Sequence, residues 1–149
     1  MRFAAFIVLT LAALGCKGLE SPAGYVPVEG RGGRTLLAVS SEDCRFSVRS
    51  IANPGEGDLD FWAEAVKNQL VRKRGYTHLA TRPLETDAGR KGVELEFTTT
   101  GRGITYLYLV TLFREKGLFH DNLEVVEAAG ERSVLAEDRA AIRAAVKKL

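Results

Sequence analysis

The segment from Ile104 to Phe113 is apolar or aromatic at nearly every position, and this constrains the fold more than any other feature of the chain. Successive side chains of a β-strand point to opposite faces of a sheet. A strand that is apolar on both faces must be covered on both sides. We therefore expect this segment to lie inside a sheet that has helices packed on each face.

Other strands surround this segment and are joined to it by short turns. Val93–Thr99 alternates between polar and apolar residues and ends at the turn Gly101-Arg102-Gly103. The returning strand is predicted from Leu118 to Ala129, with Phe119 and Leu123 on one face. Turns this short join antiparallel neighbours. Three further strands are predicted at Thr35–Val39, at Asp43–Ile51 and, before a loop from Arg82 to Lys91, at Tyr76–Thr81.

Two segments have the periodicity of amphipathic helices. Asp58 is a suitable N-cap for the first, and the basic run Arg72–Arg74 favours its C-terminus. Gly75 can end this helix in the left-handed conformation. The second helix is expected from about Leu135 to Lys148, with Ser133 as its cap.

This order of elements resembles the PsbP-like fold. The similarity lies in the hairpin from Tyr106–Val110 through Leu123–Gly130, in the helix that follows it, and in Phe61-Trp62 of the first helix. The resemblance implies an α+β fold in which helices pack on both faces of an antiparallel sheet, a three-layer α/β/α sandwich. Members of that fold are mostly binding and assembly factors, but no functional residue can be transferred from them.

The first sixteen residues look like an export signal. Arg2 supplies a positive end, and the apolar run after it is shorter than the roughly twenty residues of a membrane-spanning helix. Ala13-Leu14-Gly15-Cys16 resembles the lipobox of bacterial lipoproteins, which implies cleavage before Cys16, a lipid on its sulfur and an acylated (palmitate) amino terminus. An ordinary secretory leader and an uncleaved anchor are the alternatives. Lys17 favours the outer over the inner membrane, because an inner-membrane retention signal would place Asp there.

The chain therefore divides into a signal peptide (residues 1–15), a lipidated N-terminus with a flexible tether (16–34) and a single globular domain (35–149). The tether is indicated by Ser21-Pro22, Pro27 and Gly30-Arg31-Gly32-Gly33, which offer little apolar periodicity. The remaining length suits one domain with one core.

Cysteine usage and charge exclude some classes of protein. If Cys16 carries lipid, Cys44 has no partner for an intramolecular disulfide, and we expect a free buried thiol beside Phe46 and Val48. The formal net charge of +2 is too balanced to suggest nucleic-acid binding.

The sequence offers few candidates for chemistry. His78 and His120 are the only histidines, and we interpret both as structural or surface residues. Glu94 and Glu96 project from one strand face, as paired glycosidase carboxylates do, but this pattern is more typical of a solvated face. We therefore predict a non-enzymatic protein without a metal site, a cofactor or a catalytic residue.

The leading hypothesis is a lipid-anchored cell-envelope domain that binds a protein partner or assists envelope assembly. The alternative is a carrier of a small or lipidic ligand held between sheet and helix, which predicts a cavity near Trp62, Tyr106 and Tyr108. The candidate partner-binding residues are the basic residues at the end of the first helix and in the expected loop: Arg72, Lys73, Arg74, Arg82 and Arg90.

Overall fold

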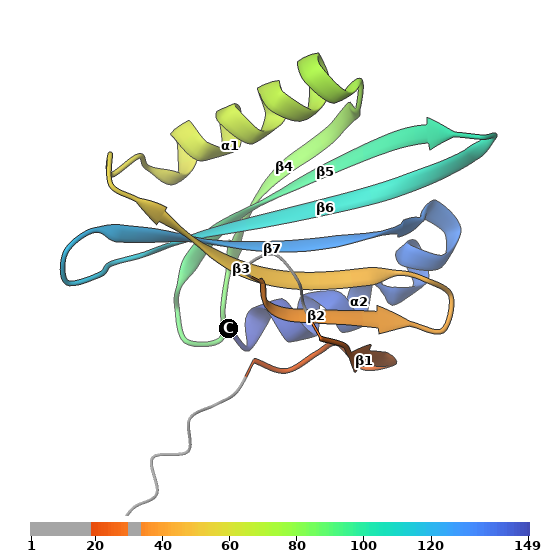
Figure 1. Cartoon of the computed structure of the whole chain (residues 1–149), viewed down its shortest axis with the longest axis horizontal. Helices are drawn as coiled ribbons and strands as arrows, with labels where there is room; N and C mark the ends of the chain where they lie inside the picture. Colours follow the sequence, from red (N-terminus) through yellow and green to blue (C-terminus); the bar gives the residue numbers. More distant parts are fainter. Residues whose placement is uncertain (1–18, 30–33) are drawn as a thin grey trace, which may run out of the picture.

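A computed structural model describes residues 19–29 and 34–149, which form a seven-stranded antiparallel sheet with two α-helices (Figure 1). The strands lie in the order β1-β2-β3-β7-β6-β5-β4. The predicted α+β class is confirmed, while the predicted signal peptide and Cys16 lie outside the described residues. The elements are β1 (Tyr25–Pro27), β2 (Arg34–Ser40), β3 (Arg45–Asn53), α1 (Leu59–Asn68), the π-helical turn η1 (Gln69–Lys73), β4 (Thr77–Glu85), β5 (Lys91–Gly101), β6 (Ile104–Glu115), β7 (Asp121–Glu131) and α2 (Arg132–Lys147).

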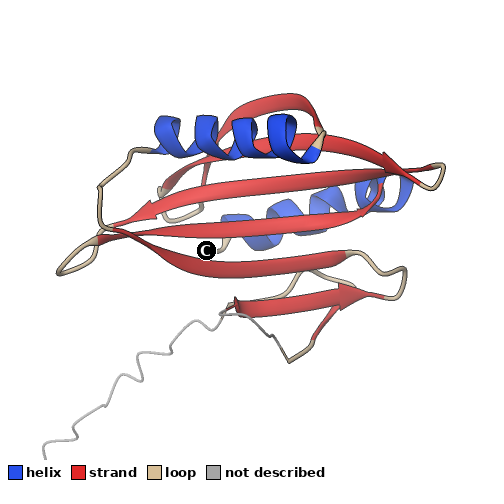
Figure 2. Ribbon diagram, turned by 45° about the horizontal axis from the view of Figure 1, so that its top comes forward, coloured by secondary structure: helices blue, strands red, loops and turns tan. Residues whose placement is uncertain are grey.

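Strand β6 lies inside the sheet and is covered on both faces, as its sequence predicts. Leu107, Leu109 and Phe113 pack in the core under α2, whereas Val110 and Leu112 pack in the core under α1. Figure 2 shows the two helices on opposite sides of the sheet. Each side is covered by a single helix, so the outer layers of the expected three-layer sandwich are incomplete. In the described chain, α1 packs on β5 and β6 and leaves β2 and β3 uncovered on its face.

The boundaries of the first helix are as predicted, whereas the cap of the second is not. The backbone N–H of Phe61 donates to the Oδ1 of Asp58 over 2.8 Å, and Gly75 takes a φ of 71° after the last turn. Ser133 lies inside α2 rather than at its cap, and its hydroxyl donates to the Glu131 carboxylate over 3.0 Å.

Two strand boundaries differ from the expected ones. β4 continues through Arg82 to Glu85, which the sequence suggested was loop. It tolerates Pro83 because it is an edge strand, where a missing N–H costs little. β7 begins only at Asp121, so Phe119 belongs to the preceding turn and does not share the face of Leu123.

Residues 19–29 contact the domain, although they were assigned to the flexible tether. β1 pairs with β2, and the buried Tyr25 donates its hydroxyl proton to the Oδ2 of Asp138 over 2.8 Å. Leu19 packs at the edge of the core under α2. A segment rich in Pro and Gly can be ordered when its few large side chains are buried by a distant element, and periodicity does not reveal such contacts.

Cys44 is free and buried beside Phe46 and Val48, as expected. Burial raises the pKa of its thiol. Gly130 of β7 lies directly against this side chain, because a Cβ atom added there would come within 2.3 Å of the Cys44 sulfur. The glycine is therefore required by the close approach of β7 to the start of β3.

Candidate partner-binding groove

The uncovered half of the sheet forms a groove beside α1. One pocket of about 310 Å³ lies over β2, β3 and β7, and a second of about 200 Å³ lies between the sheet and α1. Both contain Tyr108 and Glu127, so they adjoin, and we call them together the α1 groove. It is lined chiefly by Leu37, Val39, Arg45, Ser47, Arg49, Ile51, Tyr108 and Glu127 from the strands and by Trp62, Val66, Leu70 and Arg74 from α1 and the residues after it.

The alternation of β3 places its polar side chains in the groove. Phe46 and Val48 belong to the core under α2, so the odd-numbered residues of the strand point the other way. Arg45, Ser47 and Arg49 consequently face the α1 groove. The sequence contains this alternation, but it does not reveal that α1 leaves these strands uncovered.

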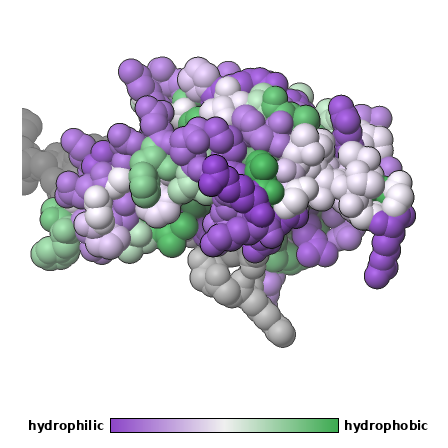
Figure 3. All heavy atoms as spheres, turned by 90° about the horizontal axis from the view of Figure 1, so that it is seen from above, coloured by the Kyte–Doolittle hydropathy of each residue, from purple (hydrophilic) through white to green (hydrophobic). Residues whose placement is uncertain are grey.

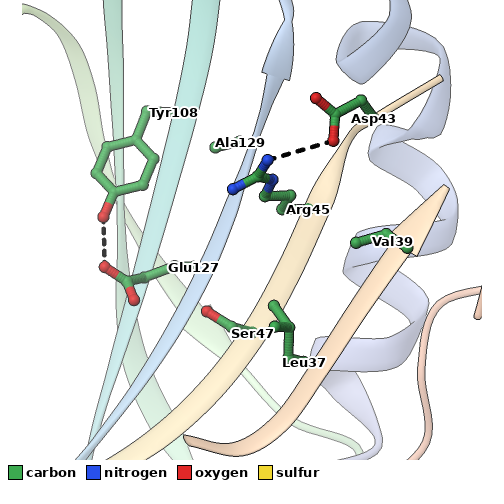
Figure 4. Close-up of a pocket in the computed structure, with 8 residues that line it drawn as sticks. All are labelled: Leu37, Val39, Asp43, Arg45, Ser47, Tyr108, Glu127 and Ala129. Atoms are coloured by element: carbon green, nitrogen blue, oxygen red, sulfur yellow. Dashed lines mark hydrogen bonds and ion pairs between the residues drawn. The ribbon is translucent and has the colours of Figure 1, made fainter. Parts of the chain in front are cut away.

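A carboxylate lies at the centre of the groove. Tyr108 donates its hydroxyl proton to the Oε1 of Glu127 (Figure 4). Arg49 approaches the same carboxylate, with its Nε 3.4 Å from Oε2. Burial, followed by the negative charge of Glu127 and this hydrogen bond, raises the pKa of Tyr108 above its usual value. The phenol is therefore protonated at neutral pH and acts as a hydrogen-bond donor.

Three of the predicted binding residues lie together at one end of the groove. Arg72, Lys73 and Arg74 are exposed at the end of η1, and Arg74 lines the groove itself. Within the described parts of the chain, these three cations form no ion pair. They make this rim of the groove positively charged.

The other two predicted residues lie elsewhere and have partners. Arg82 on β4 donates to the Oε2 of Glu96 over 2.7 Å. Arg90 forms an ion pair with Glu124 over 2.9 Å, and its guanidinium lies 4.7 Å from the ring centroid of Phe113. The five residues thus do not form one surface, because Arg82 and Arg90 pair with carboxylates on the face of the sheet that α2 covers.

Glu94 and Glu96 are buried under α2, so the expected solvated face is wrong. Arg139 reaches the Oε1 of Glu96 over 2.5 Å, and Arg143 reaches the Oε1 of Glu94 over 2.9 Å. The hydrogen bonds from Arg139, opposed by burial and aided by Arg82, lower the pKa of Glu96 to about 2. These carboxylates are neutralised by arginines and hold α2 against the sheet.

The two histidines lie on different elements. His78 on β4 is 2.9 Å from the Oγ1 of Thr81, and His120 lies in the β6–β7 turn. Residues 19–29 and 34–149 contain no group of three His, Cys, Asp or Glu side chains that could hold a metal ion. None of the helices in these ranges has the length and apolar character needed to cross a bilayer.

No family model matches the chain, and no curated protein matches it in sequence. Solved structures share its fold at low identity. LpqN of Mycobacterium tuberculosis, involved in cell envelope biogenesis, aligns with a TM-score of 0.66 and 11% identity, over 84% of this chain and 78% of LpqN.

Two further structures are similar. PA94 of Pseudomonas aeruginosa, a protein of unknown function, aligns with a TM-score of 0.56 and 12% identity over 89% of this chain and 85% of PA94. The Ran-binding protein Mog1p of Saccharomyces cerevisiae aligns with a TM-score of 0.52 and 13% identity over 86% of this chain and 82% of Mog1p. These likenesses concern the fold, and they are consistent with the predicted PsbP-like α+β class.

Proposed function

We propose that the protein is a non-enzymatic, lipid-anchored protein of the cell envelope that binds a protein partner in the α1 groove. The α1 groove is the observation that carries the binding role, because it is a large, partly apolar face that α1 leaves uncovered. The lipobox at Cys16 supports the anchor, and Lys17 supports the outer membrane. A fold shared with LpqN, which is involved in envelope biogenesis, supports the location.

The side chains of the groove indicate the chemistry of the partner. Val39, Ile51 and Val66 provide apolar contacts, and the cation of Arg74 lies at the rim. Interfaces combine such a core with complementary charge at the periphery. The partner we infer is a protein segment that presents apolar side chains next to Asp or Glu.

The binding role is tested by crosslinking followed by affinity measurements. A photoreactive residue replacing Ile51 in the full chain should crosslink one protein in intact cells, and the purified partner should bind the unmodified protein. We expect Arg74→Glu to weaken this binding about tenfold, because the new carboxylate at the rim would repel the Asp or Glu of the partner. Arg132→Glu, an exposed cation on α2 across the sheet, is the matched control. Equal affinities of the two variants would refute the groove as the binding site.

The anchor is tested separately. Labelled palmitate should be incorporated into the wild-type chain in cells and should be absent from the Cys16→Ser variant. A wild-type chain without label would refute lipidation and would leave the binding role of the α1 groove untouched.

The alternative role as a ligand carrier requires a cavity between the sheet and α1. Two pockets lie there, one of about 200 Å³ beside Trp62 and one of about 350 Å³ beside Tyr106 and Tyr108, and pockets for small molecules typically measure roughly 300–1,000 Å³. The second pocket reaches that size, so the carrier is kept as the alternative function. A ligand that co-purifies in native mass spectra would instead favour the carrier.

A further inference from the structure

The turn between β6 and β7 presents two large apolar side chains to solvent. Leu118 is 98% exposed and Phe119 is 97% exposed, whereas the other large apolar residues of the described chain are at most 65% exposed. The turn projects from the left end of the molecule in Figure 1, and apolar atoms gather at the same end in Figure 3. We call Leu118 and Phe119 the apolar tip.

The apolar tip lies at the end of the sheet where the N-terminal segment enters the fold. Gly92 at the start of β5 pairs with Phe113 near the end of β6, so the β4–β5 turn and the apolar tip share this end. Leu19 lines one pocket with Asp87 of the β4–β5 turn and with the C-terminal Leu149.

The distance along the chain to the proposed lipid is short. Leu19 follows Cys16 by three residues, and three residues of fully extended chain span at most about 11 Å. A lipid on Cys16 would therefore hold this end of the sheet close to the bilayer. Within the expected tether of residues 16–34, β1 (Tyr25–Pro27) and Leu19 contact the folded domain.

We propose that the apolar tip inserts into the bilayer that holds the Cys16 lipid, as a second membrane contact that orients the domain. This inference rests on the proposed lipid anchor. Exposed apolar side chains beside a cation suit the membrane interface, and the exposed Lys116 precedes the tip. With this end of the sheet at the membrane, the α1 groove opens sideways, parallel to the surface, where envelope partners can reach it.

The test uses the lipidated protein, extracted from cells and reconstituted into vesicles of phosphatidylethanolamine and phosphatidylglycerol. A fluorescent dye on Lys116→Cys reports on the tip, and a dye on Arg102→Cys reports on the opposite end of the sheet. Cys44 is buried and the sulfur of Cys16 is blocked by lipid, so the dye attaches at one position. We expect nitroxide lipids to quench the dye at residue 116 and to leave the dye at residue 102 bright.

Loss of the tip should abolish this quenching. In the Lys116→Cys chain, Leu118→Ser with Phe119→Ser should lower the ratio of inserted to free tip by at least about 100-fold, because two large apolar side chains are lost. The matched control is Ile104→Ser with Tyr106→Ser, a pair of partly exposed apolar residues at the opposite end, and it should leave the quenching unchanged.

The outcomes separate the two proposals. If the chain is acylated but aqueous iodide quenches the dyes at residues 116 and 102 equally, insertion is refuted. The proposed lipid anchor is not affected by that result. Quenching by nitroxide lipids that persists in the double-serine variant would also refute insertion. A mass without acyl groups on Cys16 would overturn the anchor and this inference together. The residue-116 dye could also be protected from iodide in native envelopes but not in vesicles that contain no other protein. That result would identify a protein contact and refute insertion.

Discussion

Replacing Arg139 with alanine removes the main partner of a carboxylate buried under α2. Glu96 accepts hydrogen bonds from Arg139 Nη1 over 3.2 Å and Nη2 over 2.5 Å, and from Arg82 over 2.7 Å. Together they lower its pKa from 4.5 to about 2. Since one pKa unit corresponds to about 1.4 kcal/mol, this environment favours the ionised carboxylate by about 3 kcal/mol.

We expect Arg139→Ala to lower the free energy of unfolding by about 2–3 kcal/mol at pH 7. Breaking a buried ion pair typically costs about 3–5 kcal/mol. The loss here is smaller because Arg82 still donates to Glu96. Urea unfolding followed by the fluorescence of Trp62, the single tryptophan, measures the difference.

The pH dependence of this loss tests its cause. The pKa of Glu96 is lower in the folded than in the unfolded chain, so its stabilisation is complete above about pH 4.5 and disappears as the pH falls toward 2. The difference between wild type and Arg139→Ala should shrink over the same window. Arg132→Ala, an exposed position on the same helix, should change stability by less than about 0.5 kcal/mol. A loss below about 1 kcal/mol at pH 7, or one that does not vary with pH, would refute the reasoning.

Three further substitutions probe other contacts by the same unfolding assay. Gly130→Ala should destabilise the fold by about 1–3 kcal/mol by overpacking against Cys44, and a variant as stable as wild type would contradict this close approach. Tyr108→Phe removes the hydrogen bond to Glu127 and should cost about 1–2 kcal/mol; no loss would mean that water replaces the phenol. Asn53→Ala removes two hydrogen bonds to the backbone of Gly57 in the β3–α1 loop and should lower the free energy of unfolding by about 2–4 kcal/mol. A loss as small as that of a surface substitution would show that the loop keeps its conformation without this side chain.

Local patterns were sufficient to predict most of the sheet and both helices. Alternation identified the strands around Ile104–Phe113, and Asp58 and Gly75 marked the ends of the first helix. The missed strand, β1, is three residues long, and periodicity does not reveal that it pairs with β2. The extension of β4 was missed because Pro83 signals a loop unless the strand is known to lie at an edge.

The candidate site was predicted less completely than the fold. Arg72–Arg74 were selected for their charge and do lie beside the α1 groove. Arg49 and Glu127 were missed because they come from strands far apart in sequence and meet only through the pairing of β3 with β7. The burial of Glu94 and Glu96 was not predicted, because two of their arginine partners, Arg139 and Arg143, lie on a helix more than forty residues away. Ion pairs between residues that are far apart in the chain leave no pattern in the local sequence.

The two edge strands of the sheet, β1 and β4, are poorly suited to pair with a second copy of the protein. β1 offers three residues, and β4 carries Pro83, which lacks the N–H that a further strand would need. Short or proline-containing outer strands discourage one molecule from extending the ladder of the next. A protein crowded in two dimensions on a membrane, as we propose, meets its own kind often, and these blunted margins help to keep such encounters from growing into fibrils.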